Sequence, residues 1–379
     1  MELIELGSIL EMTKGKKPIK CVDSQQEGYL PYVDIEAFEE HNYKQFTDGE
    51  KCLPCEDGDI LIVCDGSRSG LVGRAVKGYV GSTLAKISAK GVNNDYLFHF
   101  VQGKYALLNT RKKGTGTPHL NPELLKQQRL IVPSNEEQER IVSRIEELYS
   151  ELDKGAETLE KIKEQLVIYR QAVLKDAFAA FTDKVPIKTI SGLVTSGSRG
   201  WAKYYDESGA RFIRITDLTR DRIILKNDNI QYVKLPQNAE GKRSRLKEND
   251  VLVSITADLG SIALIPKNIP EAYINQHIAM IRFNNSVQGE FMAWYLKSDY
   301  GQKDLLKNKR GGGKLGLGLD DIRETPVPVV DDFTADKTVE KIDDRLSVCD
   351  SIEETITIAL QQADAMRISI IKDAFEGRL

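Results

Sequence analysis

Two stretches of the chain, one near its middle and one at its end, place apolar residues at the spacing of an α-helix. In each stretch the intervals are three and four residues over about five heptads, with Glu, Asp, Lys and Arg between them. This spacing is typical of coiled-coil helices, because it keeps one apolar seam on a single face. A lone seam would be exposed, so we expect the two helices to pair, most simply as an antiparallel coiled coil. The predicted seams are Ile141, Ile145, Leu148, Leu152, Leu159, Ile162, Leu166, Tyr169 and Val173, and Val339, Ile342, Leu346, Cys349, Ile356, Ala363, Met366 and Ile370.

The two predicted helices are copies of one module. At a constant offset of 197 residues, twelve of 37 aligned positions are identical without a gap, and the block 175–178 recurs at 372–375. Internal repetition of this kind indicates a duplicated architecture. The matched residues are Val142, Ile145, Ser150, Asp153, Glu157, Thr158, Gln165 and Arg170 with Val339, Ile342, Ser347, Asp350, Glu354, Thr355, Gln362 and Arg367, besides the two Lys-Asp-Ala-Phe blocks.

The regions before each helix contain short strand-like runs punctuated by Gly, Pro, Asn and Asp, as expected of mixed α/β globules. They are less alike than the helices, but 29–35, 58–63 and 114–120 correspond to 211–218, 249–254 and 311–317. We therefore predict an α+β chain in which two globular domains alternate with two helical segments. The expected boundaries are 1–133, 134–183, 184–330 and 331–379.

Composition narrows the class of protein. Apolar residues make up 41% of the 379 and charged residues 29%, which is typical of globular proteins. No run approaches the ~20 apolar residues of a membrane span, the first residues do not resemble a signal peptide, and five cysteines are too few for a disulfide framework. We expect a cytoplasmic protein without membrane contact.

The net charge of −4 hides a segregated distribution. The helical segments are acidic, with seven basic and eleven acidic residues over 134–176 and six and twelve over 331–379. Region 1–133 is neutral, with 17 of each sign, and 177–330 carries 23 basic and 17 acidic residues. The basic residues gather in loops of the two globules.

These loops have the composition of a phosphate-binding surface, because Lys, Arg, hydroxyls and Gly-rich backbone occur together. A single cluster of this kind is usually a solvated charge run, but here the clusters recur before the same helix in both halves. We predict DNA-binding residues at Lys14, Lys16, Lys17, Arg68, Ser69, Arg111, Lys112, Lys113, Thr115, Thr117, His119, Ser198, Arg199, Trp201, Lys242, Arg243, Arg245, Lys309, Arg310 and Lys314. For His119 an equal alternative is that it caps the helix that follows.

We predict no catalytic residues and no metal site. The run 311–316 matches G-x-G-x-x-G but follows a basic segment rather than a strand, and it lacks the remaining residues of a P-loop. Cys52, Cys55, Cys64 and His41 are a weak zinc candidate, since no second C-x-x-C accompanies them, and structural cysteines are the preferred interpretation.

One boundary carries a family resemblance. The segment Thr117-Pro118-His119-Leu120-Asn121 leads through Leu130-Ile131-Val132-Pro133 into Glu136-Glu137-Gln138-Glu139-Arg140-Ile141-Val142. It resembles the junction of target recognition domain and helical spacer in specificity subunits of type I restriction-modification systems. The alternation of two globules with two similar helices matches that family end to end. The second junction departs from the pattern, because 327–333 lacks the Glu-Glu-Gln run.

The resemblance implies a non-catalytic subunit that reads a split, asymmetric target in double-stranded DNA with its two domains. It also implies two modification subunits docked on the helices, with restriction subunits as further partners. S-adenosylmethionine, ATP and Mg²⁺ would be bound by those partners and no cofactor by this chain.

Two other classes remain as alternatives. A coiled-coil adaptor that does not bind DNA would explain the helices but not the paired basic loops. A single-chain restriction enzyme would need nuclease and methyltransferase motifs, and neither is recognised in the sequence.

Overall fold

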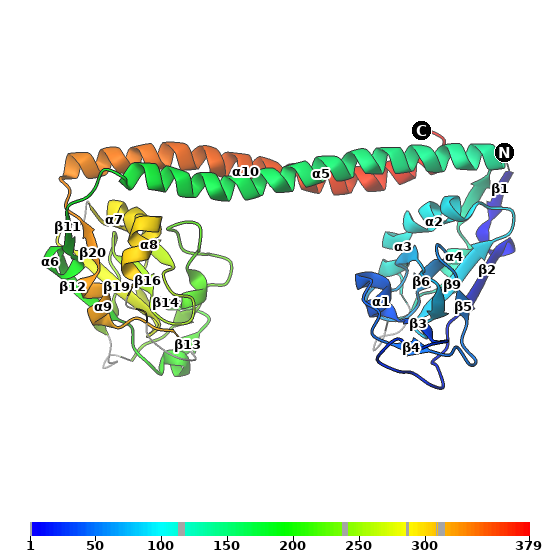
Figure 1. Ribbon diagram of the computed structural model, residues 1–379, viewed down its shortest axis with the longest axis horizontal. Coiled ribbons are helices and arrows are strands. Elements are labelled where there is room, and N and C mark those ends of the chain that lie inside the picture. The colour runs from blue at the N-terminus through cyan, green and yellow to red at the C-terminus, as the bar shows by residue number, and fades with distance from the viewer. Residues whose placement is uncertain (1, 113–117, 237–241, 286–287, 308, 310–314) are drawn as a thin grey trace. The chain divides into compact units, whose positions relative to one another are not determined.

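The computed structural model describes residues 2–112, 118–236, 242–285, 288–307, 309 and 315–379. The chain forms two compact units, and each of two long helices contributes residues to both units (Figure 1). Unit 1 comprises Met1–Thr158 and Ile358–Leu379, and unit 2 comprises Leu159–Thr357. Each unit therefore combines one globular region with one part of each long helix.

The globular region of unit 1 contains two four-stranded sheets, ordered β2-β9-β6-β7 and β4-β3-β8-β5, and a two-stranded sheet β1-β10. Its elements are β1 (Glu2–Glu5), β2 (Leu10–Lys14), β3 (Leu30–Val33), α1 (Ile35–Glu40), β4 (Phe46–Thr47), β5 (Pro54–Cys55), β6 (Ile60–Val63), β7 (Val72–Arg74), β8 (Gly78–Val80), β9 (Leu84–Ala89), α2 (Asn94–Gln102), α3 (Tyr105–Thr110), α4 (Pro122–Lys126) and β10 (Arg129–Val132).

The globular region of unit 2 has the sheets β12-β19-β16-β17, β13-β15-β14-β18 and β11-β20. Its elements are β11 (Lys184–Pro186), α6 (Ile187–Ile190), β12 (Ser191–Ser196), β13 (Tyr205–Asp206), β14 (Ala210–Ile213), β15 (Tyr232–Val233), β16 (Val251–Ser254), β17 (Ile262–Leu264), β18 (Ala272–Ile274), β19 (Ile278–Phe283), α7 (Gly289–Lys297), α8 (Asp299–Leu305), α9 (Leu319–Glu324) and β20 (Pro326–Pro328).

The two globular regions share the strand order of one sheet and differ in the other, because the parallel pair is central in β4-β3-β8-β5 and lies at the edge in β13-β15-β14-β18. The antiparallel sheet β2-β9-β6-β7 has its counterpart in β12-β19-β16-β17, and each second sheet contains one parallel pair, β3 with β8 and β14 with β18. All four residues of β6 and of β16 are buried, because these strands lie inside the sheets and apolar residues cover both faces. The predicted correspondence of 58–63 with 249–254 is thus a correspondence of central core strands.

The long helices are α5 (Asn135–Phe178) and α10 (Asp332–Phe375), each of 44 residues. Both begin at a polar side chain that accepts a hydrogen bond from the first turn. The Ser134 hydroxyl accepts from the Glu137 N–H at 3.4 Å, and the Asp331 carboxylate accepts from the Thr334 N–H at 3.0 Å. Such caps satisfy amide groups that have no partner within the helix.

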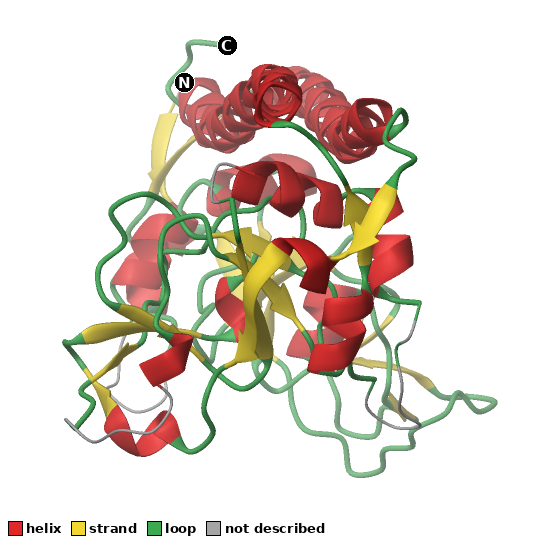
Figure 2. Cartoon of the chain, turned by 90° about the vertical axis from the view of Figure 1, so that its left-hand side faces the viewer, coloured by secondary structure: helices red, strands yellow, loops and turns green. Residues whose placement is uncertain are grey.

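The helices pair in opposite directions, which confirms the predicted antiparallel coiled coil. In unit 2, Arg170 contacts Asp350 at 2.6 Å, and further along α5 Asp176 contacts Arg345 at 3.2 Å, so the partner number falls as the α5 number rises. In unit 1, Arg367 forms an ion pair with Asp153. The helix segments lie side by side along one side of each globular region (Figures 1 and 2). The two ion pairs Arg170–Asp350 and Arg367–Asp153 occupy the same positions of the 197-residue repeat.

Two of the predicted seam residues are exposed to solvent. Tyr169 is 48% exposed and Met366 is 53% exposed, whereas Arg170 is only 6% exposed. The prediction is wrong at these positions because a helix of 3.6 residues per turn drifts relative to a strict heptad. In this register Arg170, held by Asp350 and Glu353, takes a buried position beside Leu166 and Val173.

The repeated Lys-Asp-Ala-Phe block ends each long helix with a phenylalanine that docks on an aromatic pair. Phe178 lies 5.3 Å from Phe291 and 5.4 Å from Tyr295, measured between ring centroids, and both partners are on α7. Phe375 lies 4.8 Å from Tyr96 and 5.3 Å from Phe100 of α2. Most of these contacts are edge-to-face, the arrangement favoured by aromatic rings. The block is therefore an anchor between the helix end and the globular region of the same unit.

Candidate nucleic-acid interface

Unit 1 brings side chains from three separate segments together in what we call the polar corner, defined by Lys14, Asp65 and His119. Lys14 ends β2, Asp65 follows β6, and His119 precedes α4. The Asp65 carboxylate accepts a hydrogen bond from Lys14 Nζ at 2.8 Å, and its second oxygen lies 2.7 Å from His119 Nδ1. The carboxylate therefore holds a cationic side chain and an imidazole at fixed positions.

Backbone hydrogen bonds fix the segments that carry these side chains. The Leu120 N–H donates to the Cys64 carbonyl at 2.7 Å, and the Cys64 N–H donates to the Thr83 carbonyl at 2.8 Å. Asp65 and His119 also face each other in an antiparallel bridge. The polar corner is thus part of the folded framework of the domain.

The polar corner is open to solvent. The side chains of Lys14 and His119 are 52% and 53% exposed, against 20% for Asp65. Burial works to raise the pKa of Asp65, but the hydrogen bonds from Lys14 and His119 outweigh it and hold that pKa below its ordinary value. A cavity of about 410 Å³ adjoins the corner and is lined by Met12, Lys14, Cys64, Asp65, His119, Leu120, Pro122 and Lys126.

The helix-capping alternative for His119 is wrong. The helix that follows is α4, which begins at Pro122 with Asn121 at its N-cap position. The imidazole instead pairs with Asp65, 54 residues earlier in the chain. The ring is therefore positioned by the corner and not by the helix.

Unit 2 has a polar cluster at the corresponding place, formed by Thr256, His277 and Gln276. The Thr256 hydroxyl lies 2.6 Å from His277 Nδ1, and Gln276 Nε2 lies 2.9 Å from His277 Nε2. Neither Gln276 nor His277 was among the predicted site residues, because isolated polar residues before a strand give no signal in the sequence.

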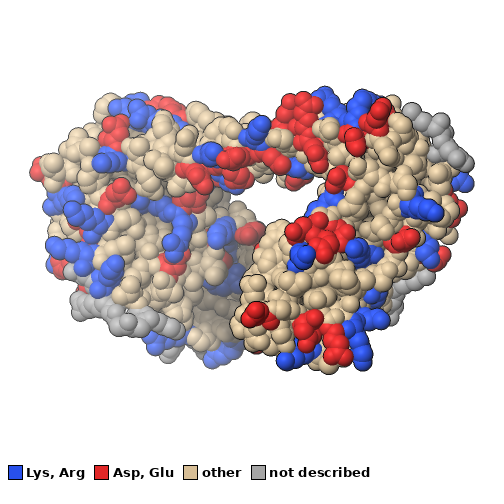
Figure 3. Space-filling model, turned by 45° about the vertical axis from the view of Figure 1, so that its right-hand side comes forward, with Lys and Arg blue, Asp and Glu red and all other residues tan. Residues whose placement is uncertain are grey.

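Most of the predicted basic residues that the structure describes lie on the surface of the globular regions. Arg68 pairs with Glu39 at 2.7 Å, and Lys112 Nζ donates to the Ser67 carbonyl at 2.9 Å, so both are held against their own domain. Figure 3 shows Lys and Arg spread over the globular regions, with acidic patches along the helices. The exposed predicted residues are Lys14, Lys16, Lys17, Arg68, Arg111, His119, Arg199, Arg243, Arg245 and Lys309, and Lys112 and Ser198 are half-buried.

Two predicted residues lie in the interior and are not available to DNA in this conformation. Ser69 is completely buried, and its hydroxyl donates to the Gly66 carbonyl at 2.7 Å. Trp201 is 4% exposed and packs against Phe212 and Tyr273, at centroid distances of 5.7 and 5.3 Å. Ser69 fixes a turn, and Trp201 is a core residue.

Some predicted residues lie outside the described part of the chain. These are Lys113, Thr115, Thr117, Arg310 and Lys314, together with the side chain of Lys242. The glycine-rich run 311–314 falls there too.

The cysteines do not gather into a metal site within the described residues, where no group of three or more His, Cys, Asp or Glu has a suitable arrangement. Cys55 and Cys64 are buried, and burial raises the pKa of each thiol to about 11. Both are therefore protonated at neutral pH and behave as core residues.

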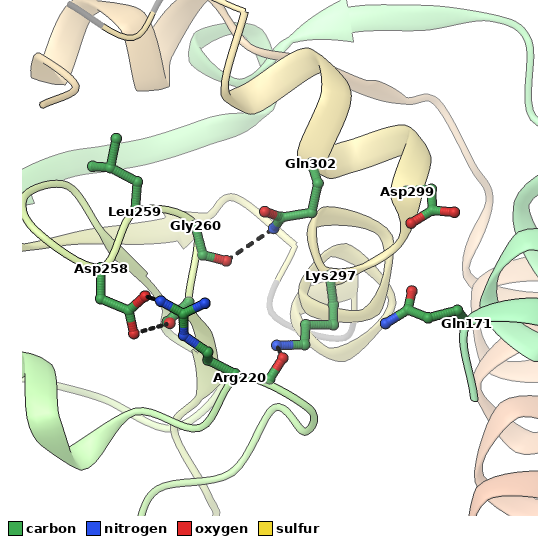
Figure 4. Close-up of a pocket in the computed structure, with 9 residues that line it drawn as sticks. Gln171, Arg220, Asp258, Leu259, Gly260, Lys297, Asp299 and Gln302 are labelled. Carbon is green, nitrogen blue, oxygen red and sulfur yellow. Dashed lines mark hydrogen bonds and ion pairs between the residues drawn. The ribbon is translucent and has the colours of Figure 1, made fainter. Parts of the chain in front are cut away.

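A second cavity, of about 160 Å³, lies where loops of unit 2 meet α5 (Figure 4). Lys297, only 6% exposed, donates to the Arg220 carbonyl, and Arg220 in turn pairs with Asp258. Burial lowers the pKa of Lys297 to about 8. Gln302 Nε2, on α8, donates to the Gly260 carbonyl at 2.9 Å. These internal bonds tie the loops together, so we assign the cavity a structural role.

The chain matches a known family over most of its length. The family model for the type I restriction modification DNA specificity domain matches residues 1–164 and again 187–362. The chain therefore belongs to this family. The two matches fall on the two halves of the duplicated architecture.

Individual relatives agree with this assignment. The chain is 26% identical to the type I restriction enzyme MjaVIII specificity subunit of Methanocaldococcus jannaschii, covering 81% of this chain and 76% of the relative. It is 22% identical to the EcoBI specificity subunit of Escherichia coli, covering 85% and 73%.

Solved structures share the fold. A chain from a type I R-M system superposes with a TM-score of 0.76 at 17% identity, covering 100% of this chain and 98% of that one. The HsdS subunit from Thermoanaerobacter tengcongensis gives 0.58 at 17% identity, with coverage of 100% and 97%. Among the described residues, no helix is long and apolar enough to cross a membrane.

Proposed function

We propose that this chain is the DNA-reading subunit of a type I restriction-modification complex. Each globular region would contact one half of a split target in double-stranded DNA, and the helices would set the distance between the halves. The observation that carries the proposal is the duplicated family domain, which repeats the sheet β2-β9-β6-β7 as β12-β19-β16-β17 and carries different side chains at the matched polar cluster. The adaptor alternative is not favoured, because the family is one of DNA specificity domains.

The coiled coil offers a surface for protein partners. In unit 2 a groove of about 650 Å³ runs along the paired helices, and its lining is mainly apolar. Ile168 and Val348, which line it, are 70% and 57% exposed. Exposed apolar patches of this kind mark protein interfaces. We assign this surface to the modification subunits, two per complex, with restriction subunits as further partners.

Catalysis belongs to those partners in this proposal. The modification subunits would bind S-adenosylmethionine and methylate adenine, and the restriction subunits would use ATP and Mg²⁺. The present chain would supply sequence selectivity, in the cytoplasm where the DNA lies.

The proposal is tested by selecting DNA from a random duplex library with the complex of this chain and its modification subunits. We expect one bipartite sequence with two different specified halves and an unspecified gap. Affinity for that sequence should exceed affinity for random duplex by about a thousandfold or more at physiological salt. Retention of DNA without sequence preference would refute the proposal.

A further inference from the structure

The backbone frame of the polar corner recurs in unit 2. The Leu317 N–H donates to the Ile255 carbonyl at 2.9 Å, the Ile255 N–H donates to the His277 carbonyl at 2.9 Å, and Thr256 bridges to Gly316. Each contact has its counterpart among those described for unit 1. The same three segments therefore converge at the same place in both domains.

On this common frame the side chains differ in kind. Thr256 occupies the position of Asp65, and Gly316 occupies that of His119, while the histidine of unit 2, His277, enters from the segment before β19. β2 pairs with β9 in the same register as β12 pairs with β19. Lys14, at the end of β2, therefore corresponds to Ser196, at the end of β12. One cluster is ionic, and the other is built from hydroxyl, amide and imidazole groups. If the two clusters only stabilised the fold, similar side chains would serve on the same backbone frame in both domains.

The polar corner of unit 1 also holds two exposed side chains in fixed orientations. Asp65 engages Lys14 with one carboxylate oxygen and His119 Nδ1 with the other, so both exposed side chains are oriented before any ligand arrives. None of the described residues is bonded to His119 Nε2. Reading a base edge depends on hydrogen-bonding groups held at fixed positions, in contrast to phosphate attachment, which any mobile cation can provide.

We propose that the polar corner of unit 1 and the polar cluster of unit 2 each read a base pair of their own half-site in the major groove. Lys14 and His119 would make the contact in unit 1, with Asp65 as the residue that positions them, and Thr256, Gln276 and His277 would do so in unit 2. This inference rests on the proposed function and assigns its specificity to particular side chains. The other exposed basic residues, Lys16 and Lys17 among them, then serve attachment to phosphates.

The test uses the same library selection with complexes that carry His119→Asn or His277→Asn. Each variant should lose discrimination, by roughly ten- to hundredfold, at one position of its own half-site, while the other half-site and the gap stay unchanged. Asp65→Asn should relax the same position as His119→Asn, because the ring loses its orienting carboxylate. The matched control is His41→Asn, at an exposed histidine with φ of 53°, a conformation that asparagine tolerates, and it should leave the selected sequence unchanged.

Lys14→Ala provides a second variant at an exposed position, so the test does not depend on one histidine variant folding. It should relax the half-site read by unit 1. A loss of affinity that is equal for all sequences, with a shallower salt dependence, would identify phosphate contacts only and overturn the inference. An unchanged selected sequence in both histidine variants would overturn it as well. In either case the wild-type complex would still select its bipartite target, and the proposed function would stand.

Discussion

Replacing Phe178 with alanine is expected to lower the free energy of unfolding of unit 2 by about 3–5 kcal/mol. The ring is 1% exposed and lies among the rings of Phe291, Tyr295 and Phe181, so its removal leaves a cavity that rigid aromatic neighbours cannot fill. Because Phe178 ends α5, the variant should also loosen the attachment of the helix to α7. Denaturant unfolding of the full chain measures the loss.

The control for this prediction is Tyr169→Ala on the same helix. Tyr169 is 48% exposed, so its truncation should change stability by about 0.5 kcal/mol or less. Equal losses for the two variants would contradict the anchoring role of Phe178. Phe375→Ala should likewise lower the free energy of unfolding of unit 1, because it removes the contacts of Phe375 with Tyr96 and Phe100.

Replacing Asp350 and Glu353 together with alanine is the second change with a large expected effect, a loss of about 2–4 kcal/mol. Both carboxylates pair with Arg170, at 2.6 and 3.0 Å, and its side chain is only 7% exposed. Burial works to lower the pKa of Arg170, but the hydrogen bond and charge of Asp350 outweigh it and hold that pKa above its ordinary value. Without its partners the guanidinium would be a buried charge with no compensation. Thermal and denaturant unfolding of the full chain measure the effect.

The opposite truncation should cost less, and this asymmetry is the sharper test. In Arg170→Met the two carboxylates keep contact with solvent, at 42% and 32% exposure, and with Arg222, which lies 3.1 and 3.0 Å from them. The repeat-related variant Asp153→Ala is a further control. Its partner Arg367 is 30% exposed, so the loss should not exceed about 1 kcal/mol. A loss for Arg170→Met as large as for the double variant would contradict the account.

The architecture could be predicted because it is periodic and duplicated. The apolar seams of α5 and α10 and the 197-residue offset can be detected in the sequence without knowledge of long-range contacts. The prediction of burial was wrong at seam positions such as Tyr169. Which side of a helix is covered there depends on the register of the helix pair, and local sequence patterns do not determine that register. The aromatic docking of Phe178 and Phe375 was marked by the repeated block, but the partners on α7 and α2 were not.

The irregular second junction has a physical explanation. In unit 1 the buried side chain of Gln138 accepts from the Asn93 N–H at 2.7 Å and donates to the Pro133 carbonyl at 3.0 Å, which ties α5 to the start of α2. In unit 2 the glutamine that makes this connection lies in the globular region, since Gln288 at the start of α7 donates to the Val330 carbonyl, just before α10, at 3.0 Å. Where the Glu-Glu-Gln run is missing, the glutamine side chain is supplied by the start of α7 in place of α5, and the junction is kept.

The candidate interface could be predicted only as a composition of loops. Runs of Lys and Arg were visible in the sequence, but Ser69 and Trp201 lie in the interior because turn and core packing use the same residue types. The pairing of Lys14 with Asp65 and of Asp65 with His119 spans 51 and 54 residues. Contacts at such separation follow from the sheet topology, which local patterns do not determine.

The most direct test of the central claim is the DNA methylation pattern of the host cell with and without this chain. Single-molecule sequencing of genomic DNA reports every methylated adenine in its sequence context. We predict that deleting the chain removes methylation from one bipartite motif with two different halves, and that returning the chain restores it. If adenine methylation at every motif is unchanged by the deletion while the modification subunits are expressed, the claim that this chain supplies their sequence selectivity is contradicted.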